Sequence, residues 1–124
     1  MAIEGSCHCG AVSFLVNDVP QRLVSCNCSA CRRFAALWFH TLTTNVTIAA
    51  APDATIAYAW GDRCLAFQSC KTCGCTTHYT PLDGTDRMAL NMRMADPDAI
   101  KDVPVRHFDG AETWAFLDLS LIHI

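Results

Sequence analysis

The sequence predicts a mainly β domain with one or two short helices, and three observations carry this prediction. Short segments rich in β-branched and aromatic residues recur along the 124-residue chain. Turn-forming pairs such as Gly61-Asp62 and Asp83-Gly84 separate these segments. Helix signals occur at only two places, and neither helix is long enough to organise a core. We therefore expect most of the chain to form antiparallel sheets.

Strands are expected in six places along the chain. In "AVSFLVN" (11–17), Val12, Phe14 and Val16 fall on one face of an extended segment, so that face should be buried. Five later segments have the same character: "ALWFHTL" (36–42), "ATIAYAW" (54–60), "RCLAFQS" (63–69), "TTHYT" (76–80) and "RMALNMRM" (87–94). We interpret the aromatic residues of these strands as core: Trp38, Phe39, Tyr58, Trp60 and Phe67.

Two short helices and one turn complete the expected elements. "DPDAIKD" (96–102) has Asp96 as N-cap and Pro97 at the first helical position, where its missing N–H costs nothing. "SACRRF" (29–34) is expected to form one helical turn after Ser29. "FDGAETW" (108–114) predicts a turn followed by an anchoring Trp114.

Length and composition predict a single domain over residues 1–124. The chain is 52% hydrophobic and 17% charged, which is typical of a globular protein, and no linker or internal repeat divides it. Its N-terminus carries Glu4 and lacks the apolar core of a secretory signal. The longest apolar run is far short of the roughly 20 residues of a membrane helix. We therefore expect a cytoplasmic protein with no membrane partner.

The nine cysteines indicate metal binding more strongly than disulfides, because cytosolic thiols are kept reduced. An odd number would also leave one cysteine unpaired in a scaffold held by disulfides alone. The cysteines form three groups: Cys7-x-Cys9, Cys26-x-Cys28-x2-Cys31 and Cys70-x2-Cys73.

The most specific local pattern is "CKTCG" (70–74), which has the form of a zinc knuckle. Its tight turn brings Cys70 and Cys73 to one metal, and Gly74 lets backbone N–H groups approach the sulfurs. A closed structural zinc needs two more ligands, which Cys7 and Cys9 could supply from an extended segment. The alternative interpretation is that these four are buried free thiols.

The remaining group, Cys26, Cys28 and Cys31, offers three ligands, as in catalytic zinc sites that keep a fourth position for water or substrate. Cys64 and Cys75 are rival fourth ligands. We expect Cys64, in an apparent strand, to be a small buried thiol, and Cys75 could equally lie beside the structural site. A fourth cysteine in the site would make the second zinc structural and remove the case for an enzyme.

Three motifs together resemble the glutathione-dependent formaldehyde-activating enzyme family, which also includes centromere protein V. They are "GSCHCGAVSF" (5–14), "CNCSACRR" (26–33) and "CKTCGCTTHY" (70–79), and the stretches "NMRMADPDAI" (91–100) and "VRHFDGAETW" (105–114) look like the C-terminal part of that family. The resemblance therefore covers nearly the whole chain.

The resemblance implies coiled antiparallel sheets of the β-tent type and two zinc ions. Cys7, Cys9, Cys70 and Cys73 would hold the structural ion, and Cys26, Cys28 and Cys31 the catalytic one. The implied reaction joins glutathione and formaldehyde to S-(hydroxymethyl)glutathione, or cleaves that carbon–sulfur bond. The expected partners are a small thiol and a carbonyl compound. The likeness to centromere protein V implies a second possibility, a zinc-stabilised binding module without turnover.

Several other side chains are weaker candidates for the site. Arg32 and Arg33 follow the cysteine triplet, and guanidinium groups suit the carboxylates of glutathione, although a solvated turn is the simpler interpretation. Arg93 is a weaker candidate of the same kind. His8 and His78 could act as general bases, but we expect each to lie either beside a metal ligand without binding the metal or in the core.

Other protein classes fit the sequence less well. Counting a four-thiolate zinc as −2 and an open three-thiolate zinc as −1 takes the formal charge from −3 to about −6, which disfavours nucleic acid. Four thiolates also suit iron, so a rubredoxin-like electron carrier is a further alternative. The apolar tail "LDLSLIHI" (117–124) fits a last strand or the edge of a homodimer, and we expect the strand.

Overall fold

The computed structural model describes residues 2–117 and confirms the mainly β prediction. The smaller of its two sheets is antiparallel and has three strands in the order β1, β2, β5. Their bounds are Ile3–Ser6, Ser13–Val16 and Val46–Ala49. Almost all of the apolar tail predicted as a last strand lies outside the described residues.

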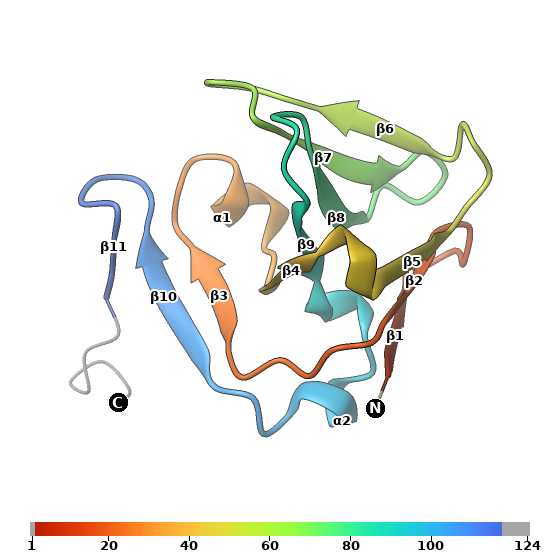
Figure 1. Cartoon of the computed structure of the whole chain (residues 1–124), viewed down its shortest axis with the longest axis horizontal. Coiled ribbons are helices and arrows are strands. Elements are labelled where there is room, and N and C mark those ends of the chain that lie inside the picture. The colour runs from red at the N-terminus through yellow and green to blue at the C-terminus, as the bar shows by residue number, and fades with distance from the viewer. Residues whose placement is uncertain (1, 118–124) are drawn as a thin grey trace.

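The larger sheet has eight strands in the order β11, β10, β3, β4, β9, β8, β7, β6 (Figure 1). In that order they are Ala115–Phe116, Val105–Asp109, Leu23–Cys26, Trp38–Leu42, Arg87–Asn91, Thr76–Pro81, Leu65–Cys70 and Thr55–Tyr58. Neighbours pair antiparallel except β10 and β3, which run parallel. This pair departs from the expected antiparallel pairing. Its two strands are far apart in sequence, so no hairpin sets their relative direction.

The helices are short, and both predicted ones are present: α1 is Cys31–Phe34 and α2 is Pro97–Ile100. The Asp96 side chain accepts a hydrogen bond from the Asp98 N–H at 2.9 Å, as an N-cap should. Two 3-10 turns, η1 (Thr43–Asn45) and η2 (Met92–Met94), complete the elements. The predicted strand 87–94 stops at Asn91, because that side chain accepts from the Arg93 N–H at 3.1 Å and starts η2.

One face of the large sheet packs against the small sheet and forms the main core. In β4 and β9, Phe39 lies opposite Leu90, and both belong to a buried cluster with Phe14 and Val16 of β2. The predicted alternation in β2 is confirmed, since Val12, Phe14 and Val16 are all almost fully buried.

The opposite face of the large sheet carries the residues that alternate along each strand with those of the main core. Val24 pairs with Trp38, His40 with Ala89, and Tyr79 with Phe67. Because side chains alternate along a strand, this second face collects a different set of large residues. Apart from Ala89, these residues line a cavity together with Cys26, Phe108 and Phe116.

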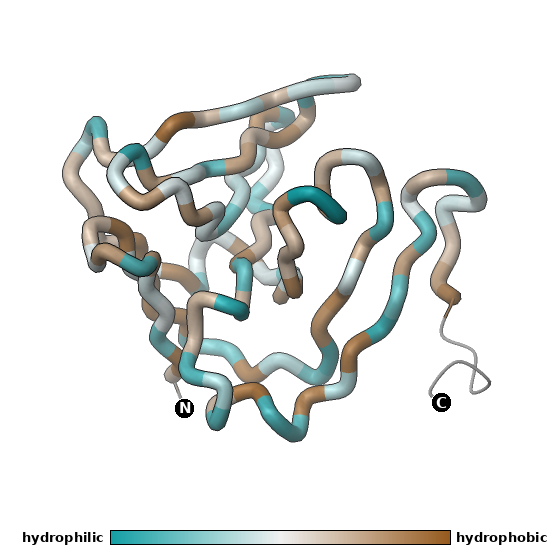
Figure 2. The backbone as a smooth tube through the Cα atoms, turned by 180° about the vertical axis from the view of Figure 1, so that it is seen from behind, coloured by the Kyte–Doolittle hydropathy of each residue, from teal (hydrophilic) through white to brown (hydrophobic). Residues whose placement is uncertain are grey.

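The hydropathy of the backbone alternates over short distances and forms no long apolar run (Figure 2). Within residues 2–117, none of the helices has the length and apolar character needed to cross a membrane.

Candidate metal centres and the adjoining cavity

The structure brings Cys7, Cys9, Cys70 and Cys73 together into one group, the four-cysteine cluster. Their sulfur atoms all lie within 4.8 Å of one another. The Sγ atoms of Cys7 and Cys9 are 3.7 Å apart, and those of Cys9 and Cys70 are 3.6 Å apart. A tetrahedral zinc with Zn–S bonds of about 2.3 Å requires sulfurs about 3.8 Å apart. The cluster therefore fits a tetrahedral zinc.

Two glycines allow the tight turns that this cluster needs. Gly10 and Gly74 have φ angles of 86° and 83°, in the left-handed region that glycine adopts without steric cost. The Gly74 N–H donates to the Cys70 carbonyl at 2.9 Å, which closes the knuckle. This turn fits the predicted role of Gly74, because the Cys75 N–H that follows it approaches the Cys73 sulfur.

Backbone N–H groups already surround the sulfurs of the cluster. Val12 donates to the Cys7 sulfur at 3.3 Å and Thr72 to the Cys70 sulfur at 3.4 Å. Donation from the Cys75 and Cys9 N–H groups lowers the pKa of Cys73 to about 5. The pKa of Cys9 is raised to about 11, because burial and the neighbouring thiols outweigh the Ala11 N–H. The protein thus favours some thiolates, and a cation would compensate the rest.

Cys75 belongs beside the four-cysteine cluster and does not close the triplet. It packs with Cys7, Cys70 and Cys73, and its thiol accepts a hydrogen bond from the His8 backbone. Its sulfur is not part of either candidate ligand group. All nine cysteines are free thiols.

The second group, Cys26, Cys28 and Cys31, is the three-cysteine cluster, and its sulfurs also lie within 4.8 Å of one another. Cys26 ends β3 and Cys31 begins α1, so a tight turn joins them. The Cys28 N–H donates to the Cys26 sulfur at 3.5 Å, and the Cys31 N–H to the Cys28 sulfur at 3.3 Å. Among residues 2–117 no fourth Cys, His, Asp or Glu joins this cluster.

The loop after β10 covers one side of the three-cysteine cluster. Asp109 accepts from the Asn27 side-chain amide at 3.0 Å, and the Ala111 N–H donates back to Asn27 at 3.0 Å. A Cβ on Gly110 would lie 2.7 Å from the Cys26 sulfur, so only glycine allows this approach. The predicted turn is confirmed. Trp114, expected to anchor this turn, packs against the Phe108 ring but is 73% exposed.

The triplet holds one acidic thiol and one that resists ionisation. Hydrogen bonding from the Cys31 thiol lowers the pKa of Cys26 to about 6. The same contact, with burial, raises the pKa of Cys31, while the Trp38 indole N–H acts in the opposite direction. That N–H is buried and makes no hydrogen bond of good geometry in the described chain. A metal-bound thiolate at Cys31 would give it an acceptor, which favours a cation at this cluster.

A cavity of about 1070 Å³ opens beside the three-cysteine cluster, and all three sulfur residues line it. Its walls include eight Phe, Tyr and Trp residues, and Arg22, His40 and Asp18 are among the polar residues on its surface. Cys64 also lines it and is only half-buried, so the expectation of a buried thiol is wrong. His40 is exposed at the cavity surface, and the pKa of its imidazole is lowered first by desolvation from the surrounding protein and then by the charge of Arg22. Neither Arg22 nor His40 was predicted as a site residue from the sequence.

The arginines predicted from the sequence lie elsewhere. Arg32 and Arg33 are exposed on α1 and are not among the cavity-lining residues. The Arg33 guanidinium donates to the Ser29 carbonyl at 2.8 Å, and that of Arg93 donates to the Ala35 carbonyl at 2.6 Å. A role for Arg32 and Arg33 in binding stays a prediction.

The two histidines weighed as general bases lie away from the cavity. His8 is exposed between two cluster cysteines. His78 is 4% exposed, pairs with Leu90 on the main-core face, and has its Nδ1 2.8 Å from the Thr77 hydroxyl. This position fits the core interpretation of His78.

Buried His78 should make folding sensitive to acid. Burial lowers its pKa from 6.5 to about 4. Between these values the unfolded chain binds the proton and the folded chain does not, so stability is complete above pH 6.5 and falls towards pH 4. The loss is about 3 kcal/mol for this shift. We expect the free energy of unfolding of His78→Asn, measured with urea, to fall less over this pH range than that of the wild type. Equal losses in both proteins would contradict the assignment.

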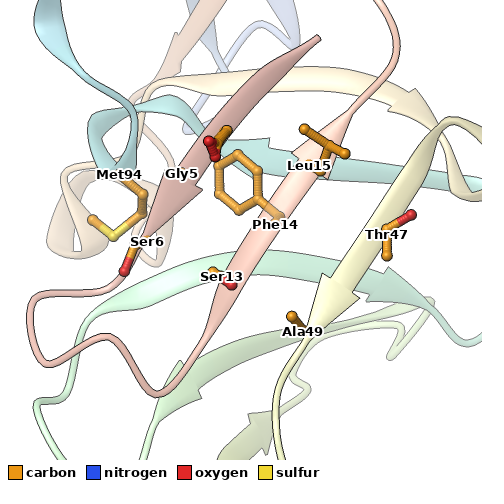
Figure 3. Close-up of a pocket in the computed structure, with 9 residues that line it drawn as sticks. Gly5, Ser6, Ser13, Phe14, Leu15, Thr47, Ala49 and Met94 are labelled. Atoms are coloured by element: carbon orange, nitrogen blue, oxygen red, sulfur yellow. The ribbon is translucent and has the colours of Figure 1, made fainter.

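A second, smaller hollow lies against the three-stranded sheet and has a volume of about 360 Å³. Figure 3 shows Phe14, Leu15, Thr47 and Met94 around it. Glu4 is the only ionisable residue in its lining, and no cysteine reaches it. It lacks the chemistry that the larger cavity holds.

Comparison with known proteins decides the family. The sequence profile of the family described as "Glutathione-dependent formaldehyde-activating enzyme" matches residues 2–108. The chain belongs to this family. The matched range contains every cysteine of both clusters, and the resemblance inferred from the cysteine motifs is confirmed.

Two relatives illustrate the membership. A Halomonas elongata protein, provisionally named a glutathione-dependent formaldehyde-activating enzyme, is 53% identical over 36 residues. The match takes in 28% of this chain and only 23% of that relative. A crystal structure of a Rhodobacter sphaeroides protein is similar, with a TM-score of 0.69 at 25% identity. The matched region covers 83% of this chain and 99% of the Rhodobacter sphaeroides chain, so the fold is shared almost throughout.

Proposed function

We propose that the protein is a zinc-dependent carbon–sulfur lyase that resembles S-(hydroxymethyl)glutathione synthase. It would join, or in reverse separate, a thiol such as glutathione and formaldehyde or another small carbonyl compound. The observation that carries this proposal is the three-cysteine cluster, which offers three ligands within residues 2–117 and lines a large cavity. A structural site would be closed by a fourth ligand.

Each of the two cysteine clusters would bind one zinc ion. Cys7, Cys9, Cys70 and Cys73 would hold a structural zinc. Cys26, Cys28 and Cys31 would hold the second zinc and leave one position open. At that position a bound zinc lowers the pKa of a thiol or polarises a carbonyl oxygen.

The remaining steps fall to side chains of the cavity. Joining a thiol to an aldehyde forms one carbon–sulfur bond and moves the thiol proton to the former carbonyl oxygen. His40 lines the cavity and the pKa of its imidazole is lowered, so we assign it the transfer of that proton. Arg22 would bind a carboxylate of the thiol, for which a guanidinium is well suited. Arg32 and Arg33 stay candidates for the same role.

Other parts of the proposal follow from this chemistry. Residues 1–124 would form one domain of this type, acting in the cytoplasm where glutathione is the main small thiol. The protein would need no nucleic acid, no membrane and no protein partner for the reaction. A homodimer stays an open alternative.

The enzyme proposal is tested by following exchange between formaldehyde and S-(hydroxymethyl)glutathione by NMR with zinc-loaded protein. We expect exchange faster than the spontaneous rate, and a His40→Asn variant that keeps its zinc should lose about 100-fold or more of the acceleration. Thr43→Ala, in η1 and outside the cavity lining, is the matched control. No acceleration with any of several thiols would leave a zinc-stabilised binding module as the function.

A further inference from the structure

The cavity beside the three-cysteine cluster gathers most of the aromatic residues of the chain. Eight of its eleven Phe, Tyr and Trp residues line the cavity, and they include all three tryptophans. The tryptophans come from separate elements: Trp38 from β4, Trp60 from the loop after β6, and Trp114 from the turn between β10 and β11.

These aromatic residues fall into an inner and an outer set. Trp38 and Phe67 are 1% and 4% exposed and form a buried cluster, so the fold itself explains them. Trp60 and Trp114 are 43% and 73% exposed, although both line the cavity. Their large apolar surfaces contribute little to the core, which is the pattern of a binding surface.

Trp114 is held in place by unusual backbone geometry. Its φ is 57°, in the left-handed region that bulky residues rarely adopt. Its N–H donates to the Asp109 carbonyl at 2.7 Å, and its ring packs edge-on against Phe108 at 5.1 Å. A Cβ on Gly110 would touch both the Cys26 sulfur and the Trp114 ring, at 2.7 and 3.5 Å. The indole therefore stands directly beside the three-cysteine cluster.

The cavity also offers one cation without an acidic partner. Arg22 is exposed, lines the cavity, and has its guanidinium carbon 4.9 Å from the centre of the Phe116 ring. No salt bridge to Arg22 exists in the part of the chain that is described. An anionic group entering the cavity would find this guanidinium available.

The size of the cavity exceeds what formaldehyde needs. A water molecule takes up about 30 Å³ of liquid, and formaldehyde is only one heavy atom larger. A cavity of about 1070 Å³ is in the range that holds a drug-sized ligand. The thiol would fill the part of the cavity near Arg22, and the aromatic wall at Trp60 and Trp114 would stay in contact with water if the carbonyl compound were so small.

We propose that this cavity takes thiol adducts of aromatic aldehydes, with the aryl group against Trp60 and Trp114 and a carboxylate of the thiol on Arg22. The inference rests on the proposed function, because it names the carbonyl partner of that same reaction. Stacking and edge contacts between aromatic rings add to the free energy from buried area, so an aryl group gains more here than a methyl group.

Binding of two stable thioethers tests the substrate class without turnover. S-Benzylglutathione and S-methylglutathione share the same peptide and differ in the group that would face the tryptophans. Because all three tryptophans line the cavity, their fluorescence reports its occupancy. We expect zinc-loaded protein to bind the benzyl compound at least about tenfold more tightly. Equal affinities would overturn the inference.

Variants show which residues produce the preference. Trp60→Ala and Trp114→Ala should each reduce the benzyl-to-methyl ratio several-fold. Arg22→Gln should weaken both compounds and leave the ratio unchanged. Tyr58→Ala is the matched control, since this aromatic residue of β6 is 53% exposed and does not line the cavity. A ratio unaffected by both tryptophan variants would also overturn the inference.

The outcome is separable from that of the enzyme test. Accelerated formaldehyde exchange without any benzyl preference would leave the proposed function in place and remove the aromatic substrate class. A benzyl preference without turnover for any adduct would support the aromatic site and remove catalysis.

Discussion

Cys73→Ser should prevent the chain from folding stably. The serine would remove one of the four sulfurs that we propose as zinc ligands. These sulfurs join the two sheets, since Cys7 follows β1 of the small sheet and Cys70 ends β7 of the large one. Structural zinc contributes roughly 10–16 kcal/mol in small domains, which equals or exceeds the whole stability of a typical domain. We expect zinc content to fall and the thermal unfolding transition to drop by tens of degrees or disappear.

The position of the cluster in the chain adds to this effect. Cys9 and Cys70 are 61 residues apart, so a metal clip between them closes a long loop and restricts the unfolded chain. Cys75→Ser is the matched control, because its thiol touches the cluster without being one of the four ligands. Circular dichroism on heating and metal analysis would compare the two variants. An unchanged transition in Cys73→Ser would show that the four cysteines hold no structural metal.

The cysteine triplet and the two halves of the four-cysteine cluster could be predicted from sequence, because the cysteines within each of these groups are close together in the chain. The spacings of Cys26, Cys28 and Cys31, and of Cys70 and Cys73, already confine each set of sulfurs to one turn. What the spacing alone left open was the fourth position of the triplet. Cys75 was excluded only by its packing beside the four-cysteine cluster, which depends on how β7 and the N-terminal turn meet.

Five strands were not predicted from the sequence, because they are short or their alternation of apolar and polar residues is weak. They are β1, β3, β5, β10 and β11. The sequence "LVSC" of β3 runs into the cysteine triplet, and "IEGS" of β1 has a single β-branched residue. Such segments become strands because neighbours pair with them, as β10 does with β3 in parallel.

The aromatic residues show the limit of periodicity. Alternation identifies the apolar face of a strand but does not say whether that face meets the core, a cavity or solvent. Phe39 and Trp38 were predicted correctly as buried, whereas Tyr58 and Trp60 are 53% and 43% exposed. Tyr58 lies in β6 and Trp60 in the loop that follows it. Because β6 is the edge strand of the large sheet, with β7 as its neighbour, less of this region is covered.

Arg22 and His40 were missed for different reasons. His40 lies two residues from Trp38 in a strand, so alternation could have placed both on one face. Arg22 precedes β3, and its ring contact with Phe116 depends on the order β3, β10, β11 in the sheet. Nothing local in the sequence reveals that order.

Cys28→Ser should remove turnover while the domain stays folded. A serine hydroxyl is a poor replacement for a thiolate ligand of zinc, and the triplet has no fourth cysteine to compensate. We expect the zinc content to fall from two ions to one per chain and formaldehyde exchange to slow by at least about 100-fold. Even mutating the hydrogen-bond partners of metal ligands typically lowers metal affinity or activity by about 10- to 100-fold. Metal analysis and NMR exchange on the same preparation would measure both.

Stability distinguishes the two clusters in this experiment. The triplet lies between β3 and α1 within a single turn, so its metal closes only a short loop and adds less to folding than the four-cysteine cluster. A Cys28→Ser protein that melts close to the wild type but lacks one zinc and its activity would assign catalysis to the triplet. A variant that keeps two zinc ions would contradict the second site.

Cys64→Ser tests whether the fourth ligand position at the three-cysteine cluster is open. Cys64 lines the same cavity, but its sulfur is outside the ligand group, so this variant should keep both zinc ions. Loss of one zinc from Cys64→Ser would mean that this thiol moves in to close the site when metal binds. The second zinc would then have four protein ligands, and a substrate thiol would have no position on the metal to occupy.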